Sequence, residues 1–234
     1  MSDLPPAPAT AGIEPGSAPS PGFGPFLTLA FLGLYFLLCI GLHIPFQLWT
    51  RISQGAEADL APWLTASLNE LAFLGAAAVG LRNLGAGWIR SLGWPPPAFW
   101  RVGSLLAAGW LGALALEIRT LEWAIARWPR LLPPLPDCSI AYALVPSVLL
   151  APLAEEAFFR GVLCEGLARR YGSATGIMGS AALFALCHWH WALWPGCLVF
   201  GILMGLAQRQ AGSILPCVIL HAANNALAWM AAAS

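Results

Sequence analysis

The sequence predicts an all-α membrane protein, a polytopic helical bundle of about seven transmembrane helices, with a range of six to eight. Of its 234 residues, 59% are hydrophobic and only 9% are charged, and the mean hydropathy is +0.71. One soluble domain of this length cannot bury so many apolar side chains. The formal net charge is zero and no basic tract is present, which argues against nucleic acid as a partner. Membrane lipid is therefore the first partner that the composition predicts.

The N-terminal part of the chain is expected to divide into two regions. Residues 1–25 are rich in Pro, Ala, Gly and Ser and contain no arginine, which predicts a disordered tail without the basic start of a signal peptide. Residues 26–234 are expected to form the membrane domain. Its first span, at about 26–48, is long enough for a hydrocarbon core of ~30 Å. His43, near the end of this span, is interpreted as an interfacial or buried hydrogen-bonded residue.

The later spans follow the same apolar pattern. The third is expected at about 99–116, and its charged continuation is amphipathic enough to leave the membrane or lie along it. The fourth, at about 140–169, is interrupted by Pro146 and Pro152, and a kinked helix at membrane depth tends to border a cavity. Ser213 is a plausible N-cap for the last span. The second, fifth, sixth and seventh spans are expected at about 62–84, 174–189, 192–208 and 213–230.

The distribution of arginines predicts an orientation for these spans. All the basic residues are arginine, and alternate loops place them unequally on the two sides of the membrane. One side holds Arg82, Arg90, Arg101, Arg169, Arg170 and Arg209, and the other holds Arg51, Arg119, Arg127 and Arg130. Because positively charged loops stay in the cytoplasm, this modest bias favours a cytoplasmic N-terminus. The expected location is integral and multi-pass, in a bacterial inner (plasma) membrane.

The cysteines are interpreted as packing residues. They form no Cys-x-x-Cys pair, and five of the six lie in apolar runs, where cysteine behaves as a small hydrophobic residue. The six are Cys39, Cys138, Cys164, Cys187, Cys197 and Cys217.

The fourth span contains two adjacent carboxylates and an arginine in an otherwise apolar run. Ionised groups are costly in a bilayer unless they meet a partner or a water-filled cavity, so this cluster predicts a functional site. Glu156 and Arg160 are four residues apart and can pair along one helical face. Glu155 lies about 100° around the helix from Glu156, so it is expected to point elsewhere and to need a partner from another helix.

Two later spans supply such partners. Phe184 and His188 are four residues apart, as are His221 and Asn225, so each pair shares a helical face. A carboxylate, two histidines and an amide on three helices can activate a water molecule or hold a metal ion. At 1.5 Å per residue, Glu155 and His188 both lie roughly 21 Å from the cytoplasmic side. His221 lies only roughly 12 Å in, so it needs an earlier helix start, a tilt or a vertical offset to join them.

Three motifs carry a resemblance to a known family. Glu155 to Arg160 fits Glu-Glu-x-x-x-Arg, Phe184 to His188 fits Phe-x-x-x-His, and His221 to Asn225 fits His-x-x-x-Asn. In this order, spacing and membrane setting, they resemble the CAAX protease and bacteriocin-processing (CPBP, or Abi) intramembrane endopeptidases. That family includes the CAAX-prenyl endopeptidase that trims farnesylated proteins. The resemblance covers about 140–230, the expected catalytic core.

The resemblance implies an activity and a role for each matching residue. The expected activity is hydrolysis of a peptide bond in a membrane-associated or prenylated, CAAX-like protein or peptide. Glu155 matches the general base that activates the hydrolytic water, and His188 matches the histidine that orients or deprotonates it. His221 and Asn225 match the pair assigned to stabilising the oxyanion. A glutamate in a low-dielectric pocket is a stronger base, which agrees with these roles.

The supporting residues and the cofactor are less defined by the resemblance. Glu156 and Arg160 match the remaining acid and base of the motif, and they could equally be a structural pair that holds the kinked helix to a neighbour. The family has been described both as metalloproteases and as glutamate-dependent proteases, so the cofactor is none or zinc. Glu155, His188 and His221 could form an open three-ligand zinc site. His-Glu-x-x-His is absent from the sequence, and direct catalysis by glutamate and histidines is preferred.

Three neighbouring residues are left out of the predicted site. Cys187 is a rival nucleophile beside His188, but adjacent residues point from different helical faces. His190 lies two residues from His188 and is expected to point the opposite way, toward the interface. Asn224 lacks the four-residue spacing from His221.

Two other classes of protein remain compatible with these residues. A small membrane transporter or proton-relay protein also uses chains of Glu and His on membrane helices, and it would show gradient-dependent uptake without cleavage. A non-catalytic peptide-binding immunity protein on the same fold would keep its phenotype in Glu155→Gln. Nothing outside the motifs selects a substrate or an oligomeric state.

Overall fold

The computed structural model describes residues 22, 24–55, 61–85, 103–127, 145–188 and 191–233. Within these ranges the regular structure is helical and contains no β-strand, which confirms the predicted all-α class. Most of the expected N-terminal tail, together with Cys138 and His190, lies outside the described residues. The division into a tail and a membrane domain therefore stays a prediction.

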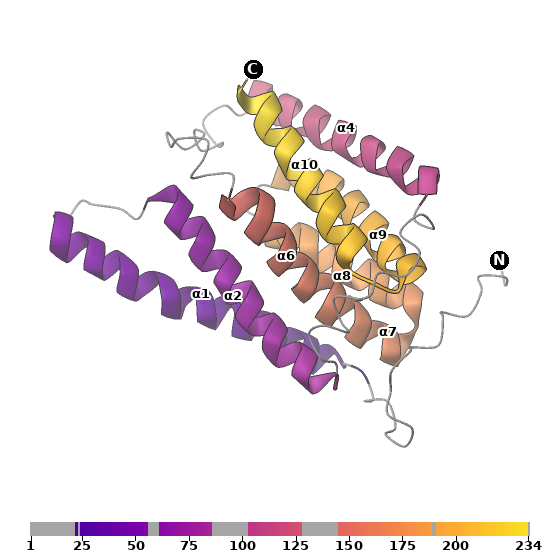
Figure 1. Ribbon diagram of the computed structural model, residues 1–234, viewed down its shortest axis with the longest axis horizontal. Coiled ribbons are helices and arrows are strands. Elements are labelled where there is room, and N and C mark those ends of the chain that lie inside the picture. The colour runs from indigo at the N-terminus through magenta and orange to yellow at the C-terminus, as the bar shows by residue number, and fades with distance from the viewer. Residues whose placement is uncertain are drawn as a thin grey trace.

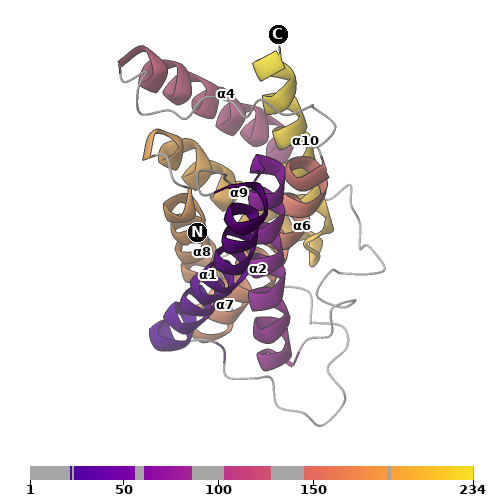
Figure 2. The same ribbon diagram turned by 90° about the vertical axis from the view of Figure 1, so that its left-hand side faces the viewer.

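The helices gather around one long central rod (Figure 1). The rod is built from η2 (Val145–Leu150), α6 (Ala151–Glu156), η3 (Ala157–Cys164) and α7 (Glu165–Tyr171). On one side lie α1 (Pro25–Gln54) and α2 (Pro62–Asn83), which pack side by side in both views (Figures 1 and 2). On the other side lie α8 (Ser173–Cys187), η4 (Trp191–Leu193), α9 (Trp194–Ala211) and α10 (Leu215–Ala233). The edge farthest from α1 is formed by α4 (Gly103–Arg127), which packs on α9.

The outer surface is apolar enough for lipid. Three of the described helices are long and apolar enough to cross a membrane, and two more are apolar but shorter. The long segments are Phe26–Gln54, Leu64–Asn83 and Trp191–Ala211, and the shorter ones are Ser173–Cys187 and Leu215–Ala228. Helix α1 turns a row of large apolar side chains outward, including Leu37, Ile44, Trp49 and Ile52. A contiguous apolar surface of this kind marks contact with lipid in an integral membrane protein.

The two prolines change the width of the rod without breaking it. Backbone angles stay in the right-handed helical region at its internal junctions, Leu150, Glu156 and Ala157. Segments η2 and η3 are wound as π-helix, in which each N–H bonds five residues back rather than four. Pro152 has no N–H to donate, and Pro146 begins the widened segment η2. The predicted interruption is therefore a local rewinding of one continuous helix.

Aromatic side chains fill the space between the rod and the helices beside it. The rings of Phe158 and Phe159 in η3 are buried and lie 5.4 and 5.5 Å from the ring of Phe73 on α2. Tyr35 on α1 stacks on Phe73 at 3.9 Å between ring centroids. Phe184 on α8 meets Phe159 edge to face at 5.2 Å. These contacts join α1, α2, η3 and α8 in one core.

Glycines allow the helices to approach one another closely. A Cβ atom on Gly80 of α2 would lie 2.4 Å from a methyl carbon of Val162 in η3. A Cβ atom on Gly201 of α9 would lie 2.9 Å from the backbone Cα of Ala181 in α8. Small residues at such contacts let helix backbones come together where lipid provides no hydrophobic driving force. The Gly- and Ala-rich sequence of α8 suits this packing.

Several predicted boundaries need correction. Helix α1 continues through Pro45 to Gln54 rather than ending near residue 48. The third span and its charged continuation form one unbroken helix that ends at Arg127. His43 makes the hydrogen bonds expected of it, because its ring nitrogens lie 2.8 Å from the Cys39 carbonyl and 3.1 Å from the Thr65 carbonyl.

The start of α10 agrees with the prediction for Ser213. The Leu215 N–H donates to the Ser213 hydroxyl at 3.1 Å, so this side chain satisfies one of the free donors at the helix start. The five described cysteines are free thiols, and three of them are buried, as the packing interpretation predicts.

The contact between α8 and α9 yields a test of packing. We expect Gly201→Ala to destabilise the protein by about 1–3 kcal/mol, since the new methyl group meets backbone that cannot turn aside. The measurement is the midpoint of unfolding in mixed micelles. Gly33→Ala on α1 is the matched control, because its methyl group would meet nothing within 4 Å. Equal midpoints for the two variants would contradict the close approach.

Candidate active site

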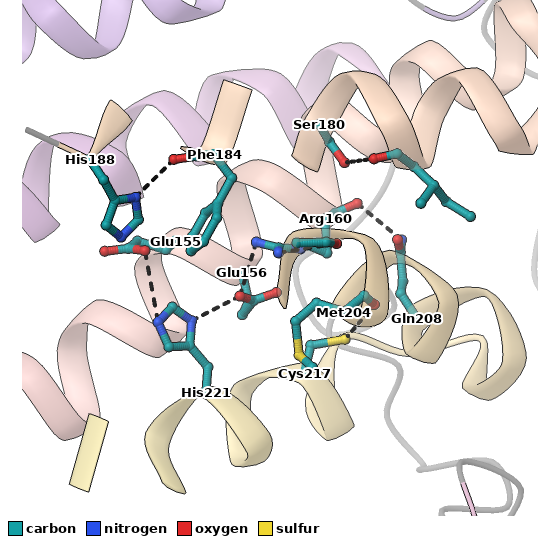
Figure 3. A network of polar contacts seen from close by, with 12 residues as sticks. Glu155, Glu156, Arg160, Ser180, Phe184, His188, Met204, Gln208, Cys217 and His221 are labelled. Carbon is teal, nitrogen blue, oxygen red and sulfur yellow. Dashed lines mark hydrogen bonds and ion pairs between the residues drawn. The ribbon is translucent and has the colours of Figure 1, made fainter. Parts of the chain in front are cut away.

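A buried ion pair forms the base of the site. Arg160 Nη1 lies 3.0 Å from Glu156 Oε1, and both side chains are fully buried. The same carboxyl oxygen lies 2.9 Å from Nδ1 of His221 on α10 (Figure 3). Because a carboxylate can only accept, Nδ1 of His221 carries the proton and donates it. Glu156 therefore fixes the orientation of His221 in addition to pairing with Arg160, a contact that sequence spacing did not reveal.

Glu155 meets the opposite edge of the same imidazole ring. Its Oε2 lies 4.0 Å from Nε2 of His221, and its side chain is 15% exposed. The two adjacent glutamates thus flank one histidine from α10, Glu156 at Nδ1 and Glu155 at Nε2 (Figure 3). Glu155 therefore points away from Glu156 and finds its partner on another helix, as the sequence predicts.

His188 caps the end of α8. The helix ends at Cys187, and His188 adopts an extended backbone conformation, so the predicted end at residue 189 is wrong. Its ring Nδ1 lies 2.9 Å from the carbonyl of Phe184, to which it donates. A histidine in this place satisfies one of the free carbonyl groups of the last turn. The four-residue spacing of the motif therefore brings the ring back beside Glu155 (Figure 3).

A vertical offset brings His221 to the depth of the glutamates. Gln208, near the end of α9, donates to the backbone carbonyl of Arg160 at 3.0 Å. Arg209 pairs with Glu165 at 3.3 Å. The turn from α9 to α10 therefore lies beside η3 and the start of α7, well before the end of the rod. His221 reaches the glutamates within two turns of α10, which resolves the mismatch in estimated depth.

Asn225 contacts the rod one turn further along α10. Its Nδ2 donates to the backbone carbonyl of Ser147 at 2.8 Å. In a π-helix that carbonyl would accept from the residue five positions on, Pro152, which has no N–H. Asn225 supplies a donor in place of the missing one. An amide nitrogen has two N–H bonds, so this contact leaves one for another acceptor.

Aromatic rings enclose the ionised groups. Phe184 covers the Arg160 guanidinium, with 4.6 Å between the central carbon and the ring centroid. Phe200 on α9 and Phe184 both meet the His221 ring edge to face, at 5.2 and 5.9 Å. Arg160 also donates to the carbonyl of Gly201 at 3.5 Å. This lining keeps lipid away from the charged groups.

Sequence reasoning missed a polar group contributed by α1 and α2. Glu70 on α2 is only 5% exposed, and its charge lies close enough to act on Glu155. Asn69 donates to Glu70 at 3.3 Å and accepts from the Tyr35 hydroxyl at 2.6 Å. The available signal was a glutamate in the middle of an apolar span.

Cys187 is a half-buried free thiol at the last residue of α8, next to His188. Adjacent positions point apart on a helix, but His188 lies beyond the helix end, so that rule does not separate the two side chains. Asn224, which was also left out, is buried within α10.

The geometry does not fit the zinc alternative. In the described part of the chain, no group of three or more His, Cys, Asp or Glu side chains is arranged to hold a metal ion. No step below is therefore assigned to a metal.

The fold and the site define a helical membrane protein with an enclosed network of glutamates, histidines and an arginine. Residues 137–227 match the model of the family described as Type II CAAX prenyl endopeptidase Rce1-like. This match covers part of the chain, agrees with the resemblance that the motifs carry, and supports intramembrane protease activity in general. The matched segment contains all seven motif residues and begins after α1, α2 and α4. Comparisons with curated proteins and with solved structures gave no match.

The charge of Glu156 yields a test of the buried network. We expect Glu156→Gln to destabilise the protein by about 3–5 kcal/mol, because it leaves the Arg160 charge buried without a counter-charge. The control is Glu122→Gln on α4, which breaks an Arg–Glu pair whose side chains are 80% and 58% exposed. Loss of such an exposed pair costs under about 1 kcal/mol. Unfolding in mixed micelles measures both variants, and equal shifts would contradict a role for the buried charge.

Proposed function

We propose that this protein is an intramembrane endopeptidase that hydrolyses a peptide bond of a membrane-associated or prenylated, CAAX-like protein or peptide. One observation carries the proposal: Glu155 Oε2 is buried, accepts no hydrogen bond from the described residues, and lies 4.0 Å from His221 Nε2. That separation is too long for a direct hydrogen bond, and a bridging water could bond to both groups. Glu155 is then the general base for that water.

His188 would orient the water from the second side. Its Nδ1 donates to the Phe184 carbonyl, so in the neutral ring the lone pair is on Nε2. That nitrogen can accept one water hydrogen while Glu155 removes the other. The hydroxide formed attacks the carbonyl carbon of the substrate, and a C–O bond forms. Glu155 then returns its proton to the leaving nitrogen as the C–N bond breaks.

The oxyanion would be stabilised from α10. His221, when both ring nitrogens are protonated, donates from Nε2, while Nδ1 stays on Glu156. Asn225 supplies the N–H bond that Ser147 does not use. A donor fixed at the developing oxyanion contributes about 2.7–4 kcal/mol to transition-state stabilisation. Glu156 and Arg160 are positioning residues in this mechanism, since they hold His221.

The substrate would reach the site from the membrane. The apolar outer faces and the match to a family of membrane proteases support a membrane-bound substrate. The distribution of arginines favours a cytoplasmic N-terminus in a bacterial inner (plasma) membrane. Seven described arginines other than Arg160 lie on helices, and none of them is needed for the steps above.

The role of Glu155 is tested by its isosteric amide. We expect Glu155→Gln to lower kcat by about 10²–10⁴-fold, because an amide cannot take a proton from water. The assay follows cleavage of a farnesylated CAAX peptide by purified protein in liposomes, and a proteomic comparison of membranes extends it to natural substrates. Glu122→Gln, on the exposed face of α4, is expected to cleave as the native protein does.

Other outcomes of this assay separate the alternatives. Equal cleavage by Glu155→Gln and the native protein would contradict the assignment of the base. Binding without cleavage by the native protein would favour the peptide-binding class. Gradient-dependent uptake into the liposomes without cleavage would favour the transporter class.

Removal of metal is expected to leave cleavage unchanged. The mechanism uses only the carboxyl, imidazole and amide groups named above. The check is the cleavage rate in liposomes washed with a chelator, measured before and after addition of Zn²⁺. A rate lost to the chelator and restored by Zn²⁺ would show that zinc takes part.

A further inference from the structure

We propose that Glu70 of α2 is a positioning residue for Glu155, and that the two buried carboxyl groups face each other and share one proton. This inference rests on the proposed function for its kinetic consequence, because it assigns a partner to the proposed base. Helix α2 lies outside the segment that matches the family, so the motifs alone do not include this residue.

The packing of α2 along the rod places Glu70 at the depth of Glu155. Close contacts pair Phe73 with Phe158, and Gly80 with Val162. Both residue numbers rise together, so α2 and the rod run in the same direction, as Figure 1 also shows. Glu70 lies three residues before Phe73, and Glu155 lies three residues before Phe158. One helical turn back from the aromatic contact therefore brings the two carboxyl groups to the same level.

A chain of hydrogen bonds holds Glu70 in place. The Tyr35 hydroxyl donates to Asn69 Oδ1 at 2.6 Å, and the Cys39 thiol donates to the same oxygen at 3.5 Å. These two donors fix the orientation of the amide, so its Nδ2 faces Glu70 Oε1 at 3.3 Å. The other oxygen, Oε2, is buried and accepts no hydrogen bond from the described residues. Glu155 Oε2 is also buried and also accepts no hydrogen bond from the described residues.

The charges around the pair favour one shared proton. On the Glu155 side lie His221 from α10, Arg160 and Glu156 from the rod, and Cys187 from α8. The neighbours of Glu70 among the described residues of α1 and α2 are the neutral groups of Asn69, Tyr35 and Cys39.

Two carboxylates in one dry pocket repel each other strongly, so one of them keeps a proton. A general base must be ionised before it can take a proton from water, so the proposed function requires the negative charge to be on Glu155. The proton therefore resides on Oε2 of Glu70, which donates it toward Glu155. This arrangement leaves Glu155 ionised and turned toward the bound water, while Glu70 stays neutral through the reaction.

Infrared spectroscopy of the protein in liposomes tests the shared proton without any substrate. At neutral pH the native protein is expected to show the C=O stretch of a buried carboxylic acid. Glu70→Gln should abolish that band, and Glu155→Gln should shift it because the hydrogen-bond acceptor changes. Glu122→Gln, which removes an exposed carboxylate, should leave it unchanged. A band that persists unchanged in Glu70→Gln would overturn the proposal.

Kinetics on the farnesylated peptide provides the second measurement. We expect Glu70→Gln to lower kcat about tenfold with KM within about twofold, as for a group that acts on the transition state. Its profile of kcat/KM against pH should be broader, because the shared proton no longer titrates. Native kcat and an unchanged profile would overturn the proposal even where Glu155→Gln is inactive.

A third variant, Tyr35→Phe, tests the hydrogen-bond chain, and the infrared measurement does not depend on peptide cleavage. Tyr35→Phe retains the ring that stacks on Phe73 but removes the hydroxyl that anchors Asn69, so it should shift the same infrared band in a folded protein. An unshifted band would contradict the hydrogen-bond chain. If the native protein cleaves no peptide, the proposed function fails, and the infrared band still decides whether Glu70 and Glu155 share a proton.

Discussion

The ion pair between Arg160 and Glu156 is the constraint on which the rest of the site depends. Both groups are fully buried, so each needs the other's charge. The pair fixes one oxygen of Glu156 beside His221, and His221 then faces Glu155. Phe184 covers the arginine and carries the carbonyl that holds His188. The buried pair of Arg160 and Glu156 therefore helps to fix the relative positions of the rod, α8 and α10.

The sequence was sufficient to predict the helical class, the membrane setting and the resemblance that the family match at residues 137–227 supports. Apolar composition and the cost of burying charge determine these features, and both are visible without coordinates. Helix ends were less predictable, because they depend on contacts between helices. Helix α8 ends at Cys187, two residues before the predicted end, and the ring of His188 bonds to the Phe184 carbonyl there. No local sequence pattern indicates this end.

Contacts across the bundle were the main source of error in the site. Helical geometry separates Glu155 from Glu156 by about 100°, and that angle could not show that His221 fits between them. Glu70 was missed because it belongs to no motif of the family and lies outside the segment that the family model matches. Asn225 was predicted from spacing, but its bond to Ser147 follows from Pro152 and the π-helical winding of the rod.

His188 at the end of α8 is held by its ring bond to the Phe184 carbonyl, by its N–H bond to the Ala185 carbonyl, and by the Trp194 indole, which donates to the His188 carbonyl. Glu155 and His221 lie within uninterrupted helices, whereas His188 occupies a helix terminus, where fraying requires little energy. Unwinding the last turn would break the bond to Phe184 and withdraw the ring from the glutamates. The local stability of this helix end therefore determines whether the ring stays beside Glu155, independently of the buried ion pair.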